Sequence, residues 1–172
     1  QLIKLKEDKY TDNIGISIYS HEDITDLPEH QQEKILNNID VLQVPCNAFD
    51  KNFFNHKNYK SLRKDIRVDK RSIFLQGLLL QDYITATKLF PEFKNELKLW
   101  EDYCIHNRLT RLEASIGNIL DYDNRNSLIL FGCRNLKEIK EILHSYEAIY
   151  KKKFKKLNRI FPKELIDPRR WK

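Results

Sequence analysis

Short apolar runs alternate along the chain with longer segments of helical periodicity. Four runs are apolar enough to predict buried strands, and they cover residues 13–19, 40–44, 66–75 and 127–132. After each run, apolar residues recur every three or four positions, which is typical of an amphipathic helix. Strands that alternate with helices indicate an α/β fold with a parallel sheet. No linker divides the four βα units, so we expect residues 1–172 to form a single domain.

Local signals place the longer helices. One helix is expected over residues 91–106, where large apolar residues recur at helical spacing. Thr110 and Glu113 form the pattern of a capping box, which predicts a helix start. Asn135 is followed three residues later by Glu138, and we expect it to cap a long last helix.

The remaining segments show neither the periodicity of a strand nor that of a helix. Residues 77–91 are expected to be irregular, and so is the tail from 161 to 168, which holds two prolines. A short helix is expected over residues 58–64, and a polar turn over 121–126.

Alternating strands and helices fit two architectures, an open doubly wound sheet and a closed (β/α)8 barrel. A doubly wound dinucleotide-binding fold carries G-x-G-x-x-G after a strand, and a P-loop also needs closely spaced glycines. The four glycines are Gly15, Gly77, Gly117 and Gly132, too far apart for either motif. The pattern therefore favours a barrel, of which four βα units make half.

Composition is that of an ordinary globular domain, with 41% hydrophobic and 33% charged residues. No run is long enough to cross a membrane, and no signal-peptide pattern opens the chain. Three widely spaced cysteines favour reduced thiols and a cytoplasmic location, and no Cys/His spacing suggests a zinc site. The chain begins at Gln1 and holds no Met, which favours a piece of a longer protein.

The net charge of +6 is concentrated near the end of the chain, in residues 151–156 and in Arg169 and Arg170. A basic stripe can bind nucleic acid, but the composition favours the solvated face of a long terminal helix. A basic nucleic-acid-binding domain that uses a helix over 151–159 stays open as one alternative, although that helix offers few aromatic side chains for base stacking.

Four segments, in order along the chain, resemble the last four strands of one family. Residues 15–20 (G-I-S-I-Y-S) are similar to the G-V-S-N-F segment of aldo/keto reductases, and residues 42–47 (L-Q-V-P-C-N) to their V-Q-x-x-x-N strand. Residues 72–79 resemble their S-P-L-x-x-G-L-L loop, and residues 131–134 (F-G-C-R) their P-G-A-R segment. The resemblance implies the C-terminal half of a (β/α)8 TIM barrel, with four βα units, a long C-terminal helix and an irregular tail.

The family binds NADP(H) and moves a hydride between nicotinamide and a carbonyl or alcohol. The resemblance therefore implies part of an NAD(P)H-dependent oxidoreductase, with NADP as the expected cofactor and NAD as the alternative. The family's catalytic Asp, Tyr, Lys and His lie on or after its second to fourth strands. No catalytic residue is expected in this chain, which should be inactive by itself.

The resemblance also implies a cofactor-binding surface. Ser17 and Gln43 would hydrogen-bond the nicotinamide carboxamide, and Arg71 replaces the family's ring-stacking tyrosine. A guanidinium can also lie flat on an aromatic ring, but it adds positive charge there. The residues that would line the pyrophosphate are Ser72, Phe74 and Leu75.

A second part of this surface lies where the last strand meets a helix N-terminus, which favours an anion. Arg134 would pair with the 2′-phosphate of NADP. Glu138 stands where some members carry a phosphate-binding Arg, and its charge opposes a phosphate. Glu141 matches the family's adenine-contacting Glu. The residues at the junction itself are Gly132, Cys133, Arg134 and Asn135.

A non-catalytic half-barrel that serves in assembly or interaction is the other alternative. Half a barrel leaves two sheet edges and its interior uncovered. The missing N-terminal half-barrel or a second copy is thus an expected partner, beside the dinucleotide and a small carbonyl or alcohol substrate. The chain alone is expected to self-associate or to be poorly soluble.

Overall fold

The computed structural model describes residues 1–57, 59, 62–120 and 127–171. They form two compact units, each with its own packing. Of the described residues, 1–46, 51–57, 59, 62–71 and 127–130 belong to the first unit, and 47–50, 72–120 and 131–171 to the second. The expectation of a single domain over residues 1–172 stays a prediction.

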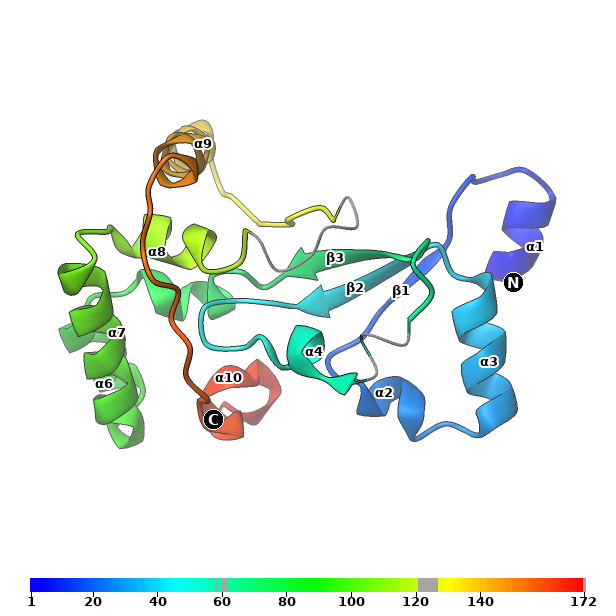
Figure 1. Cartoon of the computed structure of the whole chain (residues 1–172), viewed down its shortest axis with the longest axis horizontal. Helices are drawn as coiled ribbons and strands as arrows, with labels where there is room; N and C mark the ends of the chain where they lie inside the picture. The colour runs from blue at the N-terminus through cyan, green and yellow to red at the C-terminus, as the bar shows by residue number, and fades with distance from the viewer. Residues whose placement is uncertain (58, 60–61, 121–126, 172) are drawn as a thin grey trace. The chain divides into compact units, whose positions relative to one another are not determined.

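A three-stranded parallel sheet organises the first unit, with the strands in the order β1-β2-β3 (Figure 1). These strands are β1 (Gly15–Ser17), β2 (Val41–Pro45) and β3 (Arg67–Arg71). The predicted α/β class and the parallel strand direction are confirmed.

The two faces of this sheet differ in character, because successive side chains of a strand point to opposite faces. Leu42, Val44 and Val68 share one face and are completely buried. Lys70 lies on the same face, with its ammonium 5.8 Å from the ring centroid of Phe54. Helix α4 (Asn52–Asn55) therefore covers this face, and the other face carries mostly polar side chains.

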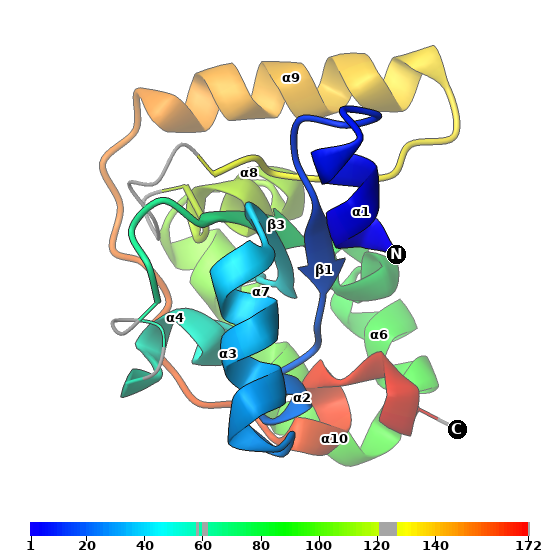
Figure 2. The same ribbon diagram turned by 90° about the vertical axis from the view of Figure 1, so that its right-hand side faces the viewer.

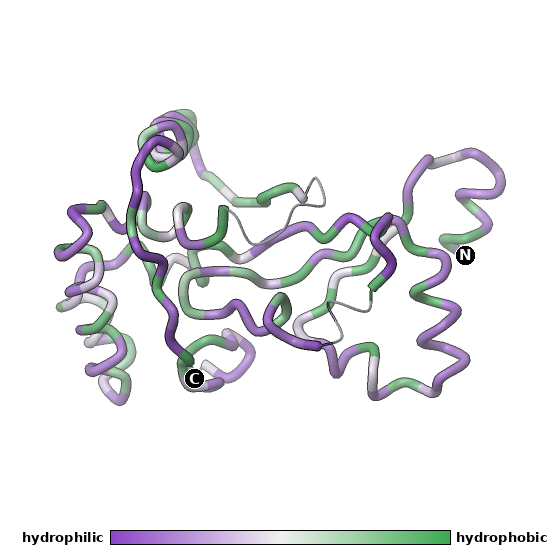
Figure 3. The backbone as a smooth tube through the Cα atoms, viewed as in Figure 1, coloured by the Kyte–Doolittle hydropathy of each residue, from purple (hydrophilic) through white to green (hydrophobic). Residues whose placement is uncertain are grey.

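Three more helices belong to the first unit: α1 (Leu2–Glu7), α2 (Glu22–Thr25) and α3 (Glu29–Asn38). Most of α3 is hydrophilic, as the purple tube of Figure 3 shows. Lys6 of α1 donates to both oxygens of Asp40, at 2.6 and 2.7 Å, which ties α1 to the start of β2. Residues 58, 60 and 61 of the helix expected over 58–64 lie outside the described residues, and so does the whole of the turn expected over 121–126.

The regular strand predicted over residues 127–132 is wrong. The structure has one parallel bridge there, between Lys70 and Ile129. The Lys70 N–H donates to the Leu128 carbonyl at 2.9 Å, and the Leu130 N–H donates to the Lys70 carbonyl at 2.8 Å. The direction of the segment agrees with the prediction, but its pairing is limited to this one position.

Two local features stop the ladder there. The Leu128 N–H donates to Asp69 Oδ1 at 3.0 Å instead of to a backbone carbonyl. At the other side, Ser72 has φ of 56°, which ends the extended backbone of β3. The strand predicted over 66–75 consequently ends at Arg71.

Helical segments of different lengths make up the second unit. They are η1 (Leu75–Leu80), α6 (Tyr83–Leu89), η2 (Pro91–Phe93), α7 (Lys94–His106), α8 (Arg111–Gly117), α9 (Leu136–Tyr150), α10 (Lys163–Ile166) and η3 (Pro168–Arg170). The helical region over 91–106 and both predicted N-caps, Thr110 and Asn135, are confirmed. None of the helices in the described residues is long and apolar enough to cross a membrane.

Two segments predicted to be irregular are helical. Within 77–91, Asp82 caps α6 by accepting a hydrogen bond from the Thr85 N–H at 2.9 Å. In the tail, α10 fits between the two prolines because Pro162 precedes it as the N-cap residue. Burial of Leu165 stabilises this short helix, which could not form by its own propensity.

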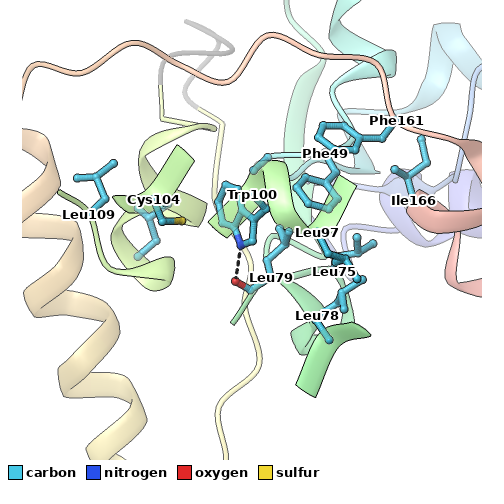
Figure 4. Packing of buried hydrophobic residues seen from close by; sticks show 14 of the residues in the cluster. Phe49, Leu75, Leu78, Leu79, Leu97, Trp100, Cys104, Leu109, Phe161 and Ile166 are labelled. Atoms are coloured by element: carbon cyan, nitrogen blue, oxygen red, sulfur yellow. Dashed lines mark hydrogen bonds between the residues drawn. The ribbon is translucent and has the colours of Figure 1, made fainter. Parts of the chain in front are cut away.

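Leucine and isoleucine side chains make up most of the core of the second unit, and three buried aromatic rings pack among them (Figure 4). Phe49 stacks on Phe161 with ring centroids 3.9 Å apart, and it meets the edge of Trp100 at 5.5 Å. The indole Nε1 of Trp100 donates to the Leu79 carbonyl at 3.0 Å, so the one polar atom of this buried ring is satisfied.

Both interpretations of the basic segment over 151–159 placed it on a helix. This prediction is wrong, because the segment is not helical. Helix α9 ends at Tyr150, and the chain continues as a hydrophilic strap (Figure 3). Tertiary contacts hold the strap: the Tyr103 hydroxyl donates to the Lys155 carbonyl at 3.0 Å, and the Leu157 N–H donates to Asn118 Oδ1 at 2.8 Å. The proposed nucleic-acid helix therefore does not exist in this structure.

We expect Gly117→Ala to lower the free energy of unfolding. An added Cβ would lie 2.5 Å from Phe154 Cζ and 2.7 Å from Ile149 Cγ1, so the strap and α9 must shift. Overpacking costs about 1–3 kcal/mol, which exceeds the roughly 1 kcal/mol that alanine gains over glycine in a helix. Urea denaturation measures the difference, with Gly132→Ala as the control because no atom lies within 4 Å of its added Cβ. A Gly117→Ala variant as stable as the parent would contradict this packing.

Candidate functional site

The first group of predicted site residues lies on the polar face of the sheet. Ser17 and Gln43 are direct register partners in β1 and β2. The Ser17 hydroxyl donates to Gln43 Oε1 at 3.4 Å. A hydroxyl and a primary amide side by side offer both hydrogen-bond donors and acceptors, which is the complement of a carboxamide. The structure brings the two residues together, and their role toward a carboxamide stays a prediction.

Arg71, at the end of β3, reaches the same place. Its Nε donates to Ser17 Oγ at 3.1 Å, and one terminal nitrogen donates to the Ile18 carbonyl at 3.1 Å. The guanidinium carbon lies 4.3 Å from the ring centroid of Tyr19. Arg71 thus joins the ends of β1 and β3 across β2, and a flat cation stacked on an aromatic ring forms the rim of this face.

Another polar pair continues this face toward the other end of β3. Arg67 donates to both carboxylate oxygens of Asp69, at 3.0 and 3.1 Å, and Asp69 is buried. Asp69 is the register partner of Gln43, so Ser17, Gln43 and Asp69 form one row across the three strands. Polar side chains therefore extend along β3 on the face that carries Ser17 and Gln43.

The loop after β3 contains the residues predicted to line a pyrophosphate. Ser72, Leu75 and Gln76 have positive φ values of 56°, 47° and 53°, which cost non-glycine residues about 1–3 kcal/mol each. Leu75 is buried, whereas Phe74 is half-buried. The loop is held in an unusual conformation, which is frequent at ligand-binding loops.

Asn47 helps to hold that loop; it ends the segment that resembles V-Q-x-x-x-N, but the sequence analysis assigned it no role. Its Oδ1 accepts hydrogen bonds from the Phe49 and Asp50 N–H groups, both at 2.9 Å. Its Nδ2 donates to the Ser72 carbonyl at 3.4 Å. The signal was present, because Asn commonly closes a turn on the backbone two residues later.

A second group of predicted residues lies around the N-terminus of α9. Asn135 Oδ1 accepts the Glu138 N–H at 3.0 Å. Glu138 in turn accepts the Arg134 N–H at 2.8 Å and pairs with the Arg134 side chain at 2.7 Å. The Arg134 N–H, followed by its guanidinium, holds the pKa of Glu138 below its usual value. The Glu138 carboxylate therefore binds Arg134 where the sequence analysis expected a phosphate.

The other residues of this group are exposed. Gly132 and Cys133 are open to solvent, and Glu141 makes a long pair with Lys137 at 3.8 Å. Cys104, by contrast, is buried, and burial raises the pKa of its thiol to about 12. Within the described ranges, no group of three or more His, Cys, Asp or Glu side chains could hold a metal ion.

No family model matches the chain, and no curated protein matches it. Among solved structures, a glycerol dehydrogenase from Gluconobacter oxydans is similar, with 17% sequence identity and a TM-score of 0.48. The match covers 94% of this chain and 55% of the dehydrogenase, so the chain spans little more than half the length of that protein. A likeness at this level carries no argument about activity.

We expect Asn47→Ala to destabilise the protein by about 2–3 kcal/mol, because the buried Phe49 N–H and a second N–H would lose their acceptor. Asn37→Ala, on the exposed face of α3, is the matched control and should change the unfolding free energy by less than about 0.5 kcal/mol. Thermal and urea unfolding followed by circular dichroism would measure both. Equal stability of the two variants would show that Asn47 does not hold the loop.

Proposed function

We propose that this chain is the cofactor-binding part of an NAD(P)H-dependent oxidoreductase of the aldo/keto reductase kind, acting on a carbonyl or alcohol. The observation that carries the proposal is the register pair Ser17–Gln43, with side-chain oxygens 3.4 Å apart. The pair lies toward the carboxyl ends of parallel strands, where α/β enzymes bind their ligands. The sequence resemblance contributes the identity of the ligand.

In this proposal, the chain's own residues bind and orient the nicotinamide group. The Ser17 hydroxyl rotates from Gln43 Oε1 toward the carboxamide carbonyl, and Gln43 Oε1 accepts from the carboxamide NH₂. Holding the ring by both ends of its amide selects which ring face meets the substrate. The cofactor supplies the hydride. Residues that polarise the substrate are proposed to lie outside this chain, which then has no turnover by itself.

Arg71 sets the redox preference of the site in this proposal. Its guanidinium bonds to Ser17, so a ring held by Ser17 and Gln43 lies beside a fixed positive charge. The oxidised nicotinamide ring is cationic, whereas the reduced ring is neutral. Two unit charges about 4 Å apart repel by about 1–4 kcal/mol between water and the partly desolvated edge of a protein. The reduced cofactor is therefore preferred.

The second group of residues is assigned to the adenosine end. Arg134 binds the 2′-phosphate after leaving Glu138, and Glu141 contacts the adenine. Because the Arg134–Glu138 pair must open first, the preference for NADP over NAD is small. NADP remains the proposed cofactor, with NAD as the weaker alternative.

Ser17→Ala and Gln43→Leu are expected to weaken NADPH binding about 3- to 10-fold each, since each removes one hydrogen bond worth roughly 0.5–1.5 kcal/mol. The enhancement of NADPH fluorescence on titration with the 172-residue chain gives the dissociation constant. Ser20→Ala is the control, because Ser20 uses its backbone N–H and not its hydroxyl in its bond to Asp23. Absence of saturable NADPH and NADH binding by the parent chain would contradict the proposal.

Arg71→Gln is expected to reduce the preference for the reduced cofactor by roughly tenfold, which corresponds to about 1.4 kcal/mol. Displacement of bound NADPH by NADP⁺ gives the ratio of the two affinities. Arg159→Gln removes the same charge from an exposed position and should leave the ratio unchanged. A ratio that is equal in the parent and in Arg71→Gln would remove Arg71 from this role even if NADPH binds.

A further inference from the structure

Helix α9 carries two apolar stripes, and only one of them is covered. Ile142 and Ile149 are buried, where α9 packs on α8. The second stripe is exposed: Leu136, Leu143, Tyr146 and Tyr150 keep 64%, 52%, 42% and 73% of their accessible surface. We call Leu136, Ile139, Leu143, Tyr146 and Tyr150 the outer seam of α9, the long helix of Figure 2.

The spacing of the outer seam is that of a helix-pairing surface. Its members follow one another at intervals of three, four, three and four residues, which places them in one line along the helix. The rings of Tyr146 and Tyr150 stack with centroids 6.1 Å apart, which forms a continuous aromatic ridge. Single exposed apolar residues need no explanation, but four exposed residues in one line with the half-buried Ile139 mark a docking face for another helix.

Charges beside the seam specify the partner. Lys140 and Glu147 each follow a seam residue by one position, so they lie on the same flank, two helical turns apart. Both are exposed, and neither forms an ion pair within the part of the chain that the structure describes. The opposite flank is the buried stripe of Ile142 and Ile149.

This arrangement of charges complements itself when the helix is reversed. In an antiparallel pair of identical helices, Lys140 of one copy approaches Glu147 of the other, and the two-fold symmetry makes this contact twice. A parallel pair would bring each charged flank against the other copy's buried stripe, with no ion pair. The seam therefore fits a second copy of this chain in antiparallel orientation.

We propose that α9 mediates an antiparallel homodimer through its outer seam. A 15-residue helix is about 22 Å long. A pair of such helices buries less than the ~1,200 Å² of a standard interface, so the dimer is weak and depends on protein concentration. This self-association does not rest on the oxidoreductase proposal. It also differs from pairing at an open sheet edge, because it needs side chains of α9 alone.

Sedimentation equilibrium of the 172-residue chain, from about 5 to 200 µM, tests the proposal. Leu143→Glu is expected to abolish the dimer. Lys140→Glu and Glu147→Lys should each weaken it roughly tenfold through like-charge contacts, and the double exchange should restore the parent constant within about threefold. Lys153→Glu, an exposed lysine beyond α9, matches the charge change and should have no effect.

Circular dichroism melts show whether each variant is folded. If Leu143→Glu unfolds, Lys140→Glu, Glu147→Lys and the double exchange still test the proposal, because both positions are exposed. A chain that is monomeric over the whole range overturns the proposal. So does a dimer that persists in Leu143→Glu, which would point to pairing at a sheet edge. Failure of the double exchange to restore association overturns the antiparallel orientation and with it the assignment of the partner.

Discussion

The parallel register of β1, β2 and β3 is the constraint on which the candidate site depends. Side chains of a strand alternate between faces, so a shift of one residue would move Ser17 or Gln43 to the opposite face. Burial of Leu42, Val44 and Val68 fixes the register, since each contributes about 1.5–3 kcal/mol only when it lies on the covered face. The apolar row on one face thereby aligns Ser17 with Gln43 on the other.

That alignment also gives Arg71 its place. Because β3 continues two residues beyond Asp69, the register partner of Gln43, the Arg71 side chain can reach back to Ser17 and to the Tyr19 ring. The neutral side chains of Ser17 and Gln43 thus lie beside the positive charge of Arg71, which a hydrogen bond to Ser17 holds in place. This combination distinguishes the site from a purely neutral carboxamide pocket, and it links the backbone register to a proposed preference for the reduced form of a cofactor. At the N-terminus of α9, by contrast, the positive charge of Arg134 is neutralised by its ion pair with Glu138.

Features with local signals could be predicted from the sequence. The strand around Leu42, the caps at Thr110 and Asn135, and the proximity of Ser17 and Gln43 follow from periodicity, capping chemistry and the parallel arrangement. The cap of α6 has a local signal as well, because Asp82 is followed three residues later by Thr85, whose N–H it accepts. The hydrogen bond from Arg71 to Ser17 has no local sequence signal, because it depends on where β1 and β3 end relative to each other.

The remaining errors have tertiary causes. The strand expected at 127–132 is interrupted because the Asp69 side chain captures the Leu128 N–H. Residues 151–159 leave the helix because α7 and α8 bind the strap through Tyr103 and Asn118. Helix α10 exists because Leu165 is buried. In each case, a contact between residues far apart in sequence outweighs local propensity.

The most direct test of the site is a ¹⁵N–¹H NMR titration of the chain with NADPH. The account predicts that the side-chain amide signal of Gln43 and the backbone signals of Ser17 and Arg71 shift together and saturate with one binding constant. Shifts confined to the basic strap at 151–159, or no shift at Gln43 at saturating NADPH, would contradict it.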